Sequence, residues 1–170
     1  MESHYTLPGP RFERPARLLV VVAPFYRDIA DALMSGARAA IDRAGAGHET
    51  IEVPGALELP AAIGLAARSG AFDAFVALGC VIRGETTHYE TVCNDSSRGL
   101  TLLGLQGHCI GNGILTVETH AQAAVRADPA GQDKGGGAAV AAMHLLLLKR
   151  RFATPDRPLP EGSFRVAEAE

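Results

Sequence analysis

Apolar and polar positions along the chain form two kinds of pattern, which alternate from residue 17 onward. Continuous apolar runs such as RLLVVVA (17–23) and AFVALGC (74–80) are typical of strands that are covered on both faces. Between these runs, apolar residues recur every four positions from Ile29 to Ile41, as on one face of a helix. The pattern predicts strands at 17–23, 48–53, 74–80 and 109–116, and helices at 28–45, 55–70, 88–104, 118–127 and 138–153.

Residues that commonly begin and end helices support these boundaries. Asp28 is placed to cap the start of the first helix and Gly45 to end it, while Pro60 suits the first turn of the second helix. The stretch DPAGQDKGGG (128–137) is rich in turn-forming residues, so we interpret it as a break before the last helix.

The alternation of strands and helices predicts a single α/β domain with a parallel sheet. We expect this domain to span residues 17–153. An N-terminal arm (1–16) precedes it, and a flexible, proline-rich tail (154–170) follows it.

Composition and charge narrow the possible functions. The 170 residues are 47% hydrophobic and 21% charged, which is typical of an ordinary globular protein. The net charge is −3 and tryptophan is absent, so neither a basic surface nor an aromatic platform for nucleic acid is indicated. The N-terminus lacks an apolar targeting segment, and no apolar stretch reaches the roughly 18 residues of a membrane span. We therefore expect a cytoplasmic protein with no nucleic-acid or membrane partner.

Cysteine and histidine are spaced without a metal-binding or disulfide pattern. The three cysteines, Cys80, Cys93 and Cys109, are irregularly placed in or beside apolar runs, which favours buried free thiols. No two histidines have the spacing of metal ligands on one face of an element, so we expect no metal site.

Residues able to do chemistry gather just after the predicted strands. The carboxyl ends of parallel strands share one edge of a sheet, and ligands bind in the crevice beyond that edge. We therefore expect a site at this edge, formed by an aromatic ring, charged groups, a hydroxyl and an imidazole. These are Phe25, Glu58, Arg83, Glu85, Thr86 and His88.

His88 and the turn before it carry the strongest chemical signal. The pKa of a histidine normally lies near neutrality, which suits proton transfer, although a surface histidine at the start of a helix fits the position equally well. The turn RGETTH (83–88) leads into a predicted helix, whose first N–H groups and dipole suit an anion such as phosphate. The plainer interpretation is an ordinary helix start capped by Thr86 or Thr87.

Other candidates have a structural interpretation beside the functional one. Phe25 either stacks on a flat ring or fills the core, and Glu58 either binds a heterocycle N–H or favours a helix N-terminus. Arg126 and Lys134 either reach a phosphate or are solvated surface charges. A Cys80–His88 nucleophile pair is disfavoured, because Cys80 ends an apolar strand. GQDKGGG lacks the spacing of a phosphate-binding loop.

Three motifs in this order, VPGALELP, ALGCVIRGETTHYE and DKGGGAAVAA, resemble the lumazine synthase family over about residues 17–153. The resemblance implies a flavodoxin-like, three-layer α/β/α sandwich with a four-stranded parallel sheet. It implies a transferase of riboflavin biosynthesis that condenses 5-amino-6-(D-ribitylamino)uracil with 3,4-dihydroxy-2-butanone 4-phosphate. The products are 6,7-dimethyl-8-ribityllumazine, phosphate and water. It also implies no cofactor and a homopentamer, or an icosahedral 60-mer of pentamers, with active sites between subunits.

The resemblance assigns roles to individual residues. His88 matches the proton-transfer residue. The pyrimidine and ribityl chain are bound by Phe25, Gly55, Ala56, Leu57, Glu58, Cys80, Val81, Ile82 and Asn112. The phosphate is bound by Gly84, Glu85, Thr86, Arg126 and Lys134, of which the last two come from the adjacent subunit. Arg83 receives no catalytic role, and we expect it to pair with a carboxylate and hold the shape of the turn.

Some positions depart from the family pattern. Asn112 stands where many relatives have an aromatic residue, Tyr26 where asparagine is common, and Pro24 where arginine is typical. Asn112 motivates an alternative, a non-catalytic member of the fold that binds a flavin or lumazine. A mainly structural assembly with a vestigial site is disfavoured, because the charged site residues are present.

Overall fold

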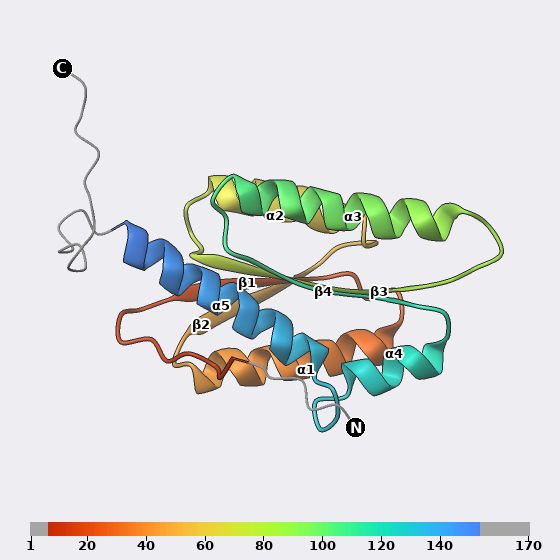
Figure 1. Ribbon diagram of the computed structural model, residues 1–170, viewed down its shortest axis with the longest axis horizontal. Helices are drawn as coiled ribbons and strands as arrows, with labels where there is room; N and C mark the ends of the chain where they lie inside the picture. Colours follow the sequence, from red (N-terminus) through yellow and green to blue (C-terminus); the bar gives the residue numbers. More distant parts are fainter. Residues whose placement is uncertain (1–6, 154–170) are drawn as a thin grey trace, which may run out of the picture.

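The computed structural model describes residues 7–153 and forms one three-layer sandwich (Figure 1). The strands are β1 (Arg17–Val22), β2 (Gly47–Glu52), β3 (Ala74–Ile82) and β4 (Ile110–Val117). The helices are α1 (Arg27–Arg43), α2 (Glu58–Arg68), α3 (His88–Leu105), α4 (His120–Ala127) and α5 (Lys134–Phe152). The predicted α/β class and flavodoxin-like sandwich are confirmed, and the N-terminal residues 1–6 and the predicted tail lie outside the described part.

All strand pairs are parallel, and the sheet order is β2-β1-β3-β4. Helices α2 and α3 cover one face, and α1, α4 and α5 cover the other (Figure 1). Successive residues of β1 and β3 point to opposite faces, so Leu18 and Val76 enter the core under α1 and α5, while Leu19 and Phe75 enter the core under α2 and α3. Burial on both faces explains why these strands are continuous apolar runs.

Four predicted helix starts are wrong. Helices α2 and α4 begin at Glu58 and His120, three and two residues after the predicted starts. Helix α1 begins at Arg27 after Tyr26, so Asp28 lies in the first turn and does not cap it; its carboxylate pairs with His120 instead. Helix α5 begins at Lys134, four residues before the predicted start. Asp133 has a left-handed backbone (φ 43°) and its Oδ1 accepts a hydrogen bond from the N–H of Gly136 at 3.0 Å. The side-chain cap allows a run of glycines to enter the helix, although glycine alone favours a break.

The end of α1 is close to the prediction. Ala44 is the C-cap, and Gly45 follows it with a φ of +72°, a conformation that glycine adopts without strain. Residues 7–16, from the predicted arm, lie against helices: the N–H of Phe12 donates to the carbonyl of Ala44, and His144 Nε2 lies 3.0 Å from the carbonyl of Pro8.

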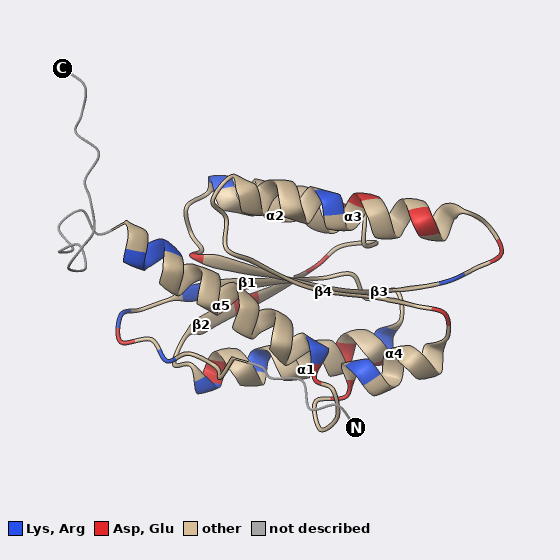
Figure 2. Cartoon of the chain, viewed as in Figure 1, with Lys and Arg blue, Asp and Glu red and all other residues tan. Residues whose placement is uncertain are grey.

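Charged residues are scattered over the elements, with a positive group in the last turn of α5 (Figure 2). These residues, Lys149, Arg150 and Arg151, interact favourably with the partial negative charge at the C-terminal end of the helix dipole. No helix within residues 7–153 is long and apolar enough to cross a bilayer.

The glycine-rich start of α5 packs against α1 at very close range. A Cβ built on Gly135 would overlap the carbonyl oxygen of Leu33, and one built on Gly111 in β4 would overlap the carbonyl oxygen of Ala138. A Cβ on Gly137 would meet nothing within 4 Å. Of Gly135 and Gly137, which both lie in the first turn of α5, packing therefore requires only Gly135 to lack a side chain.

Substitution of these glycines tests that difference. We expect Gly135→Ala to destabilise the protein by about 2–4 kcal/mol, because backbone must move to make room. The matched control Gly137→Ala should stabilise it by up to about 1 kcal/mol through helix propensity. Thermal melting at one fixed protein concentration measures both. Equal melting temperatures for the two variants would contradict the close packing.

Candidate active site

A pocket of about 400 Å³ lies at the carboxyl edge of the sheet. The loops after β1, β2 and β3 and the first turns of α2 and α3 form its walls. Its size falls within the range of small-molecule sites. The lining residues are Ala23, Phe25, Tyr26, Gly55, Ala56, Leu57, Glu58, Cys80, Val81, Ile82, Gly84, Thr86, His88, Tyr89 and Val92.

Phe25 presents an apolar ring at the mouth of this pocket. Its side chain is 74% exposed, so it does not fill the core, and of the two interpretations the functional one fits better. The ring meets Tyr26 edge to face at a centroid distance of 5.2 Å. An exposed, oriented aromatic ring beside a pocket is suited to stacking on a flat heterocycle.

The opposite wall is the turn between β3 and α3. Backbone pairing with β4 continues as far as Arg83, whose N–H donates to the carbonyl of Val117 at 3.0 Å. The N–H groups of Gly84, Glu85 and Thr86 have no hydrogen-bond partner within residues 7–153. Free N–H donors at the start of a helix form an anion-binding turn.

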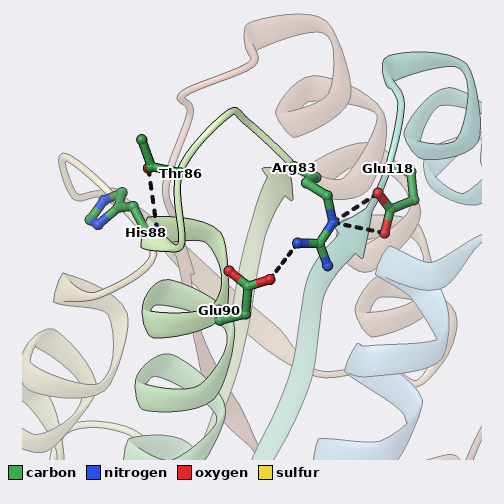
Figure 3. Close-up of polar contacts among 5 residues, drawn as sticks. All are labelled: Arg83, Thr86, His88, Glu90 and Glu118. Carbon is green, nitrogen blue, oxygen red and sulfur yellow. Dashed lines mark hydrogen bonds and ion pairs between the residues drawn. The ribbon is translucent and has the colours of Figure 1, made fainter.

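His88 is the first residue of α3, and its exposed imidazole lines the pocket. Its backbone N–H donates to Thr86 Oγ1 at 3.3 Å, so the expected hydroxyl at the helix start is Thr86 (Figure 3). Thr87 is the N-cap residue but its side chain makes no cap hydrogen bond. The imidazole points away from Arg83 (Figure 3), and His88 is among the residues that line the pocket. It is therefore available to exchange a proton with a bound molecule.

Arg83 was expected to pair with one carboxylate, and in the structure it pairs with two. Its Nε lies 3.1 and 2.9 Å from the two carboxylate oxygens of Glu118, and its Nη1 donates to Glu90 (Figure 3). The guanidinium carbon also lies 4.2 Å from the centre of the Tyr89 ring. Hydrogen bonding to Arg83 lowers the pKa of the Glu90 carboxyl. These contacts join the start of α3 to the end of β4.

The thiol of Cys80 is buried on the face of the sheet that α1 and α5 cover, among the side chains of that core. Burial raises the pKa of this thiol to about 11. A thiol with such a pKa is not a nucleophile at neutral pH, so the structure also disfavours a Cys80–His88 nucleophile pair. Within residues 7–153, no group of three or more His, Cys, Asp or Glu is arranged to hold a metal ion.

Four predicted site residues do not line the pocket of a single chain. Glu85 lies in the turn but is exposed outside the lining. Asn112 is an exposed residue in the middle of β4, paired with Ala77, and its Oδ1 accepts from the N–H of Ile114. Arg126 in α4 donates to the carbonyl of Gln122, and Lys134 is exposed at the start of α5. The pocket of one chain therefore lacks the two predicted cations.

Sequence reasoning missed several residues of the pocket. Tyr26, Tyr89 and Val92 line it without having been candidates, and their apolar surface accounts for part of its wall. Tyr89 and Val92 follow His88 in α3, so their spacing along a helix was the available signal. The pair between His120 and Asp28 was also missed; it is 2.9 Å long and ties the start of α4 to α1.

Comparison with known proteins gives consistent matches. A model of the 6,7-dimethyl-8-ribityllumazine synthase family matches residues 15–150. A 6,7-dimethyl-8-ribityllumazine synthase of Jannaschia sp. (strain CCS1) is 53% identical over 162 residues, which cover 94% of this chain and 91% of that protein. The enzyme of that name from Sphingopyxis alaskensis is 58% identical over 137 residues, which cover 81% and 97% of the two chains.

The buried state of Cys80 predicts slow reaction with iodoacetamide. At pH 7.5 a thiol of pKa about 11 should be ionised roughly 100-fold less than one with the ordinary value of 9.0. Mass spectrometry of the peptide that contains Cys80 should show labelling slowed by about that factor relative to the same protein unfolded in guanidinium. Equal labelling rates in the folded and unfolded protein would show that Cys80 is accessible and reactive, and would make it a candidate nucleophile again.

Proposed function

The chain belongs to the 6,7-dimethyl-8-ribityllumazine synthase family, and from this premise we propose how its pocket performs the reaction. It is an enzyme of riboflavin biosynthesis that condenses 5-amino-6-(D-ribitylamino)uracil with 3,4-dihydroxy-2-butanone 4-phosphate. The products are 6,7-dimethyl-8-ribityllumazine, phosphate and water. The observation that carries the assignment of roles is one pocket that joins an exposed ring, an imidazole and unpaired N–H donors.

The pyrimidine occupies the side of the pocket nearest Phe25. The ring of Phe25 stacks on the flat heterocycle, and the backbone around Val81 and Ile82 faces its edge. Residues 55–58 form the wall beside it, where Glu58 begins α2 and offers a carboxylate to a heterocycle N–H or a ribityl hydroxyl. The other residues of this subsite are Gly55, Ala56, Leu57 and Cys80, the last through its backbone, because its thiol lies in the core under α1 and α5.

The phosphate of the second substrate binds at the turn before α3. Gly84, Glu85 and Thr86 offer backbone N–H donors that have no partner in the described chain. Phosphate is the leaving group, and donors aligned on its oxygens stabilise the charge that develops as it departs. Arg126 and Lys134 of an adjacent subunit supply the cations that the pocket of one chain lacks.

His88 moves protons between the two substrates. The amine of the uracil substrate attacks the ketone of the butanone phosphate, so the enzyme itself needs no amine nucleophile. Loss of water and phosphate then requires proton transfers, for which the exposed imidazole beside the turn is suited. Holding the two substrates in register supplies much of the remaining acceleration.

The active sites lie between subunits of a homopentamer, either free or within an icosahedral 60-mer. Support comes from three leucines on the outer surface of α2 and α3: Leu65, Leu102 and Leu105 are 64%, 53% and 80% exposed. Such a patch on a surface helix pair is suited to burial against a second copy. The absence of Arg126, Lys134 and Asn112 from the pocket of one chain also favours a shared site.

The reaction itself needs no cofactor, since the amine and the phosphate leaving group belong to the substrates. The protein acts in the cytoplasm. A non-catalytic flavin-binding role, suggested by Asn112, receives no support from relatives that all carry the name of the synthase.

Activity with both substrates tests the function and the role of His88. Purified protein should form 6,7-dimethyl-8-ribityllumazine, followed by its absorbance, and His88→Ala should lower kcat by about 10–100-fold through loss of proton transfer. The control His48→Gln changes a histidine that lies in β2 and pairs with Asp42, outside the pocket, and should leave the rate unchanged. Tight flavin binding without turnover by the wild type would select the non-catalytic alternative instead.

Mixed assemblies test whether the sites are shared. His88→Ala and Arg126→Ala, carried on differently tagged chains and co-expressed, should regain activity, because a site can take Arg126 from one variant and His88 from the other. Random assortment gives about one quarter intact sites. Each variant co-expressed with itself is the control, and light scattering gives the number of subunits. Activity no higher than in these controls would place the whole site within one subunit.

A further inference from the structure

Arg83 lies at the boundary between β3 and the phosphate-binding turn, and it is not part of the pocket lining. Its guanidinium is held by two carboxylates, Glu118 next to the end of β4 at Nε and Glu90 in α3 at Nη1 (Figure 3). It also lies over the Tyr89 ring, 4.2 Å from the ring centre. The side chains of Arg83, Glu90 and Glu118 are 41%, 47% and 56% exposed, and ion pairs of this kind contribute little to stability. The network therefore matters more for the directions in which it holds these side chains than for the stability that it adds.

The partner that matters most is Glu90. Thr87 and Glu90 have the spacing of a capping box, in which a glutamate three residues after the N-cap bonds back to the N-cap N–H. In this structure Thr87 makes no side-chain cap, and the carboxylate of Glu90 is turned toward Arg83 instead (Figure 3). Arg83 thus holds Glu90 out of the position that its sequence spacing favours.

This displacement has a consequence for the turn. The N–H groups of Gly84, Glu85 and Thr86 have no partner within the described residues, and they are one residue or more from the N-cap. A carboxylate folded back onto the N–H of Thr87 would lie next to these donors and repel the negative charge of a phosphate bound there. Glu90 would carry that charge at neutral pH, since its carboxyl has a pKa below its usual range while it is paired and an ordinary acidic value when it is free.

We propose that Arg83 is a positioning residue that keeps the phosphate-binding turn open by holding the carboxylate of Glu90 away from it. Glu118 and Tyr89 fix the guanidinium in the place from which it does this. The backbone N–H of Arg83 donates to the carbonyl of Val117, which fixes the position of Arg83 relative to the sheet. This inference rests on the proposed phosphate site.

The test is a pair of variants in which the second change removes the effect of the first. Arg83→Ala should raise the KM for 3,4-dihydroxy-2-butanone 4-phosphate by about tenfold, with kcat and the KM for the uracil substrate within about threefold of the wild type. Arg83→Ala combined with Glu90→Ala should return that KM to within about threefold of the wild type, because no carboxylate is then left to fold back. A purely structural role for Arg83 would make the double variant no better than the single one.

A matched control removes a different arginine at the same edge of the molecule. Arg27 pairs with Glu52 at 2.6 Å, is similarly exposed and does not line the pocket. Arg27→Ala should leave all three kinetic constants within about twofold, which separates the loss of a positive charge from the release of Glu90. If Arg83→Ala does not give folded protein, Arg83→Met, which keeps the stem over Tyr89, replaces it with the same expectations.

Binding of inorganic phosphate, measured by calorimetry, gives a readout that does not depend on turnover. Affinity should fall about tenfold in Arg83→Ala and recover in the double variant. Wild-type turnover with no change in either variant would overturn this inference and leave the proposed function standing. Absent wild-type turnover with the expected phosphate affinities would overturn the proposed function and leave the role of Arg83 standing. Failure of the double variant to recover in either measurement would reject the inference.

Discussion

Strand β3 is the element on which the rest of the molecule depends. It is the longest strand, its residues from Ala74 to Cys80 are buried, and it pairs with β1 on one side and β4 on the other. Both cores of the sandwich are built against it, because alternate side chains enter the layers on opposite faces. Where burial ends, after Cys80, the strand becomes half-exposed and the pocket begins. The transition from core to active site is therefore a change in burial along one strand.

Parallel pairing then determines which residues meet. Since the strands run in the same direction, their carboxyl ends share an edge, and segments from three separate loops are brought to one pocket. Polar contacts between elements hold the groups at this edge: Arg83 joins the turn after β3 to the end of β4, and Asp28 joins α1 to α4 through His120. Each pair is exposed and weak alone, so its importance lies in orientation.

Parts of the fold were predictable because they depend on local chemistry. The burial pattern of each strand and the long motif around Gly84 to His88 were readable in the sequence, and the pocket contains most of the residues assigned to it. The start of α5 was not predictable in this way. Glycine propensity favoured a break at residues 134–137, but the cap by Asp133 and the close approach to Leu33 required a helix without side chains at that place. Asp28 was misassigned for a similar reason, since its partner, His120, is distant in sequence.

The sequence by itself determined the class of fold, the family and the chemical identity of the groups at the sheet edge, because strand periodicity and motif spacing are local properties of the chain. Tertiary structure alone decided how these groups are used. It placed Phe25 in an exposed position beside the pocket and the thiol of Cys80 in the core under α1 and α5. It also paired Glu90 with Arg83, although the position of Glu90 in the sequence favours a helix cap. The physical reason is that side-chain direction and pairing depend on neighbours from other elements, which spacing along one chain does not record.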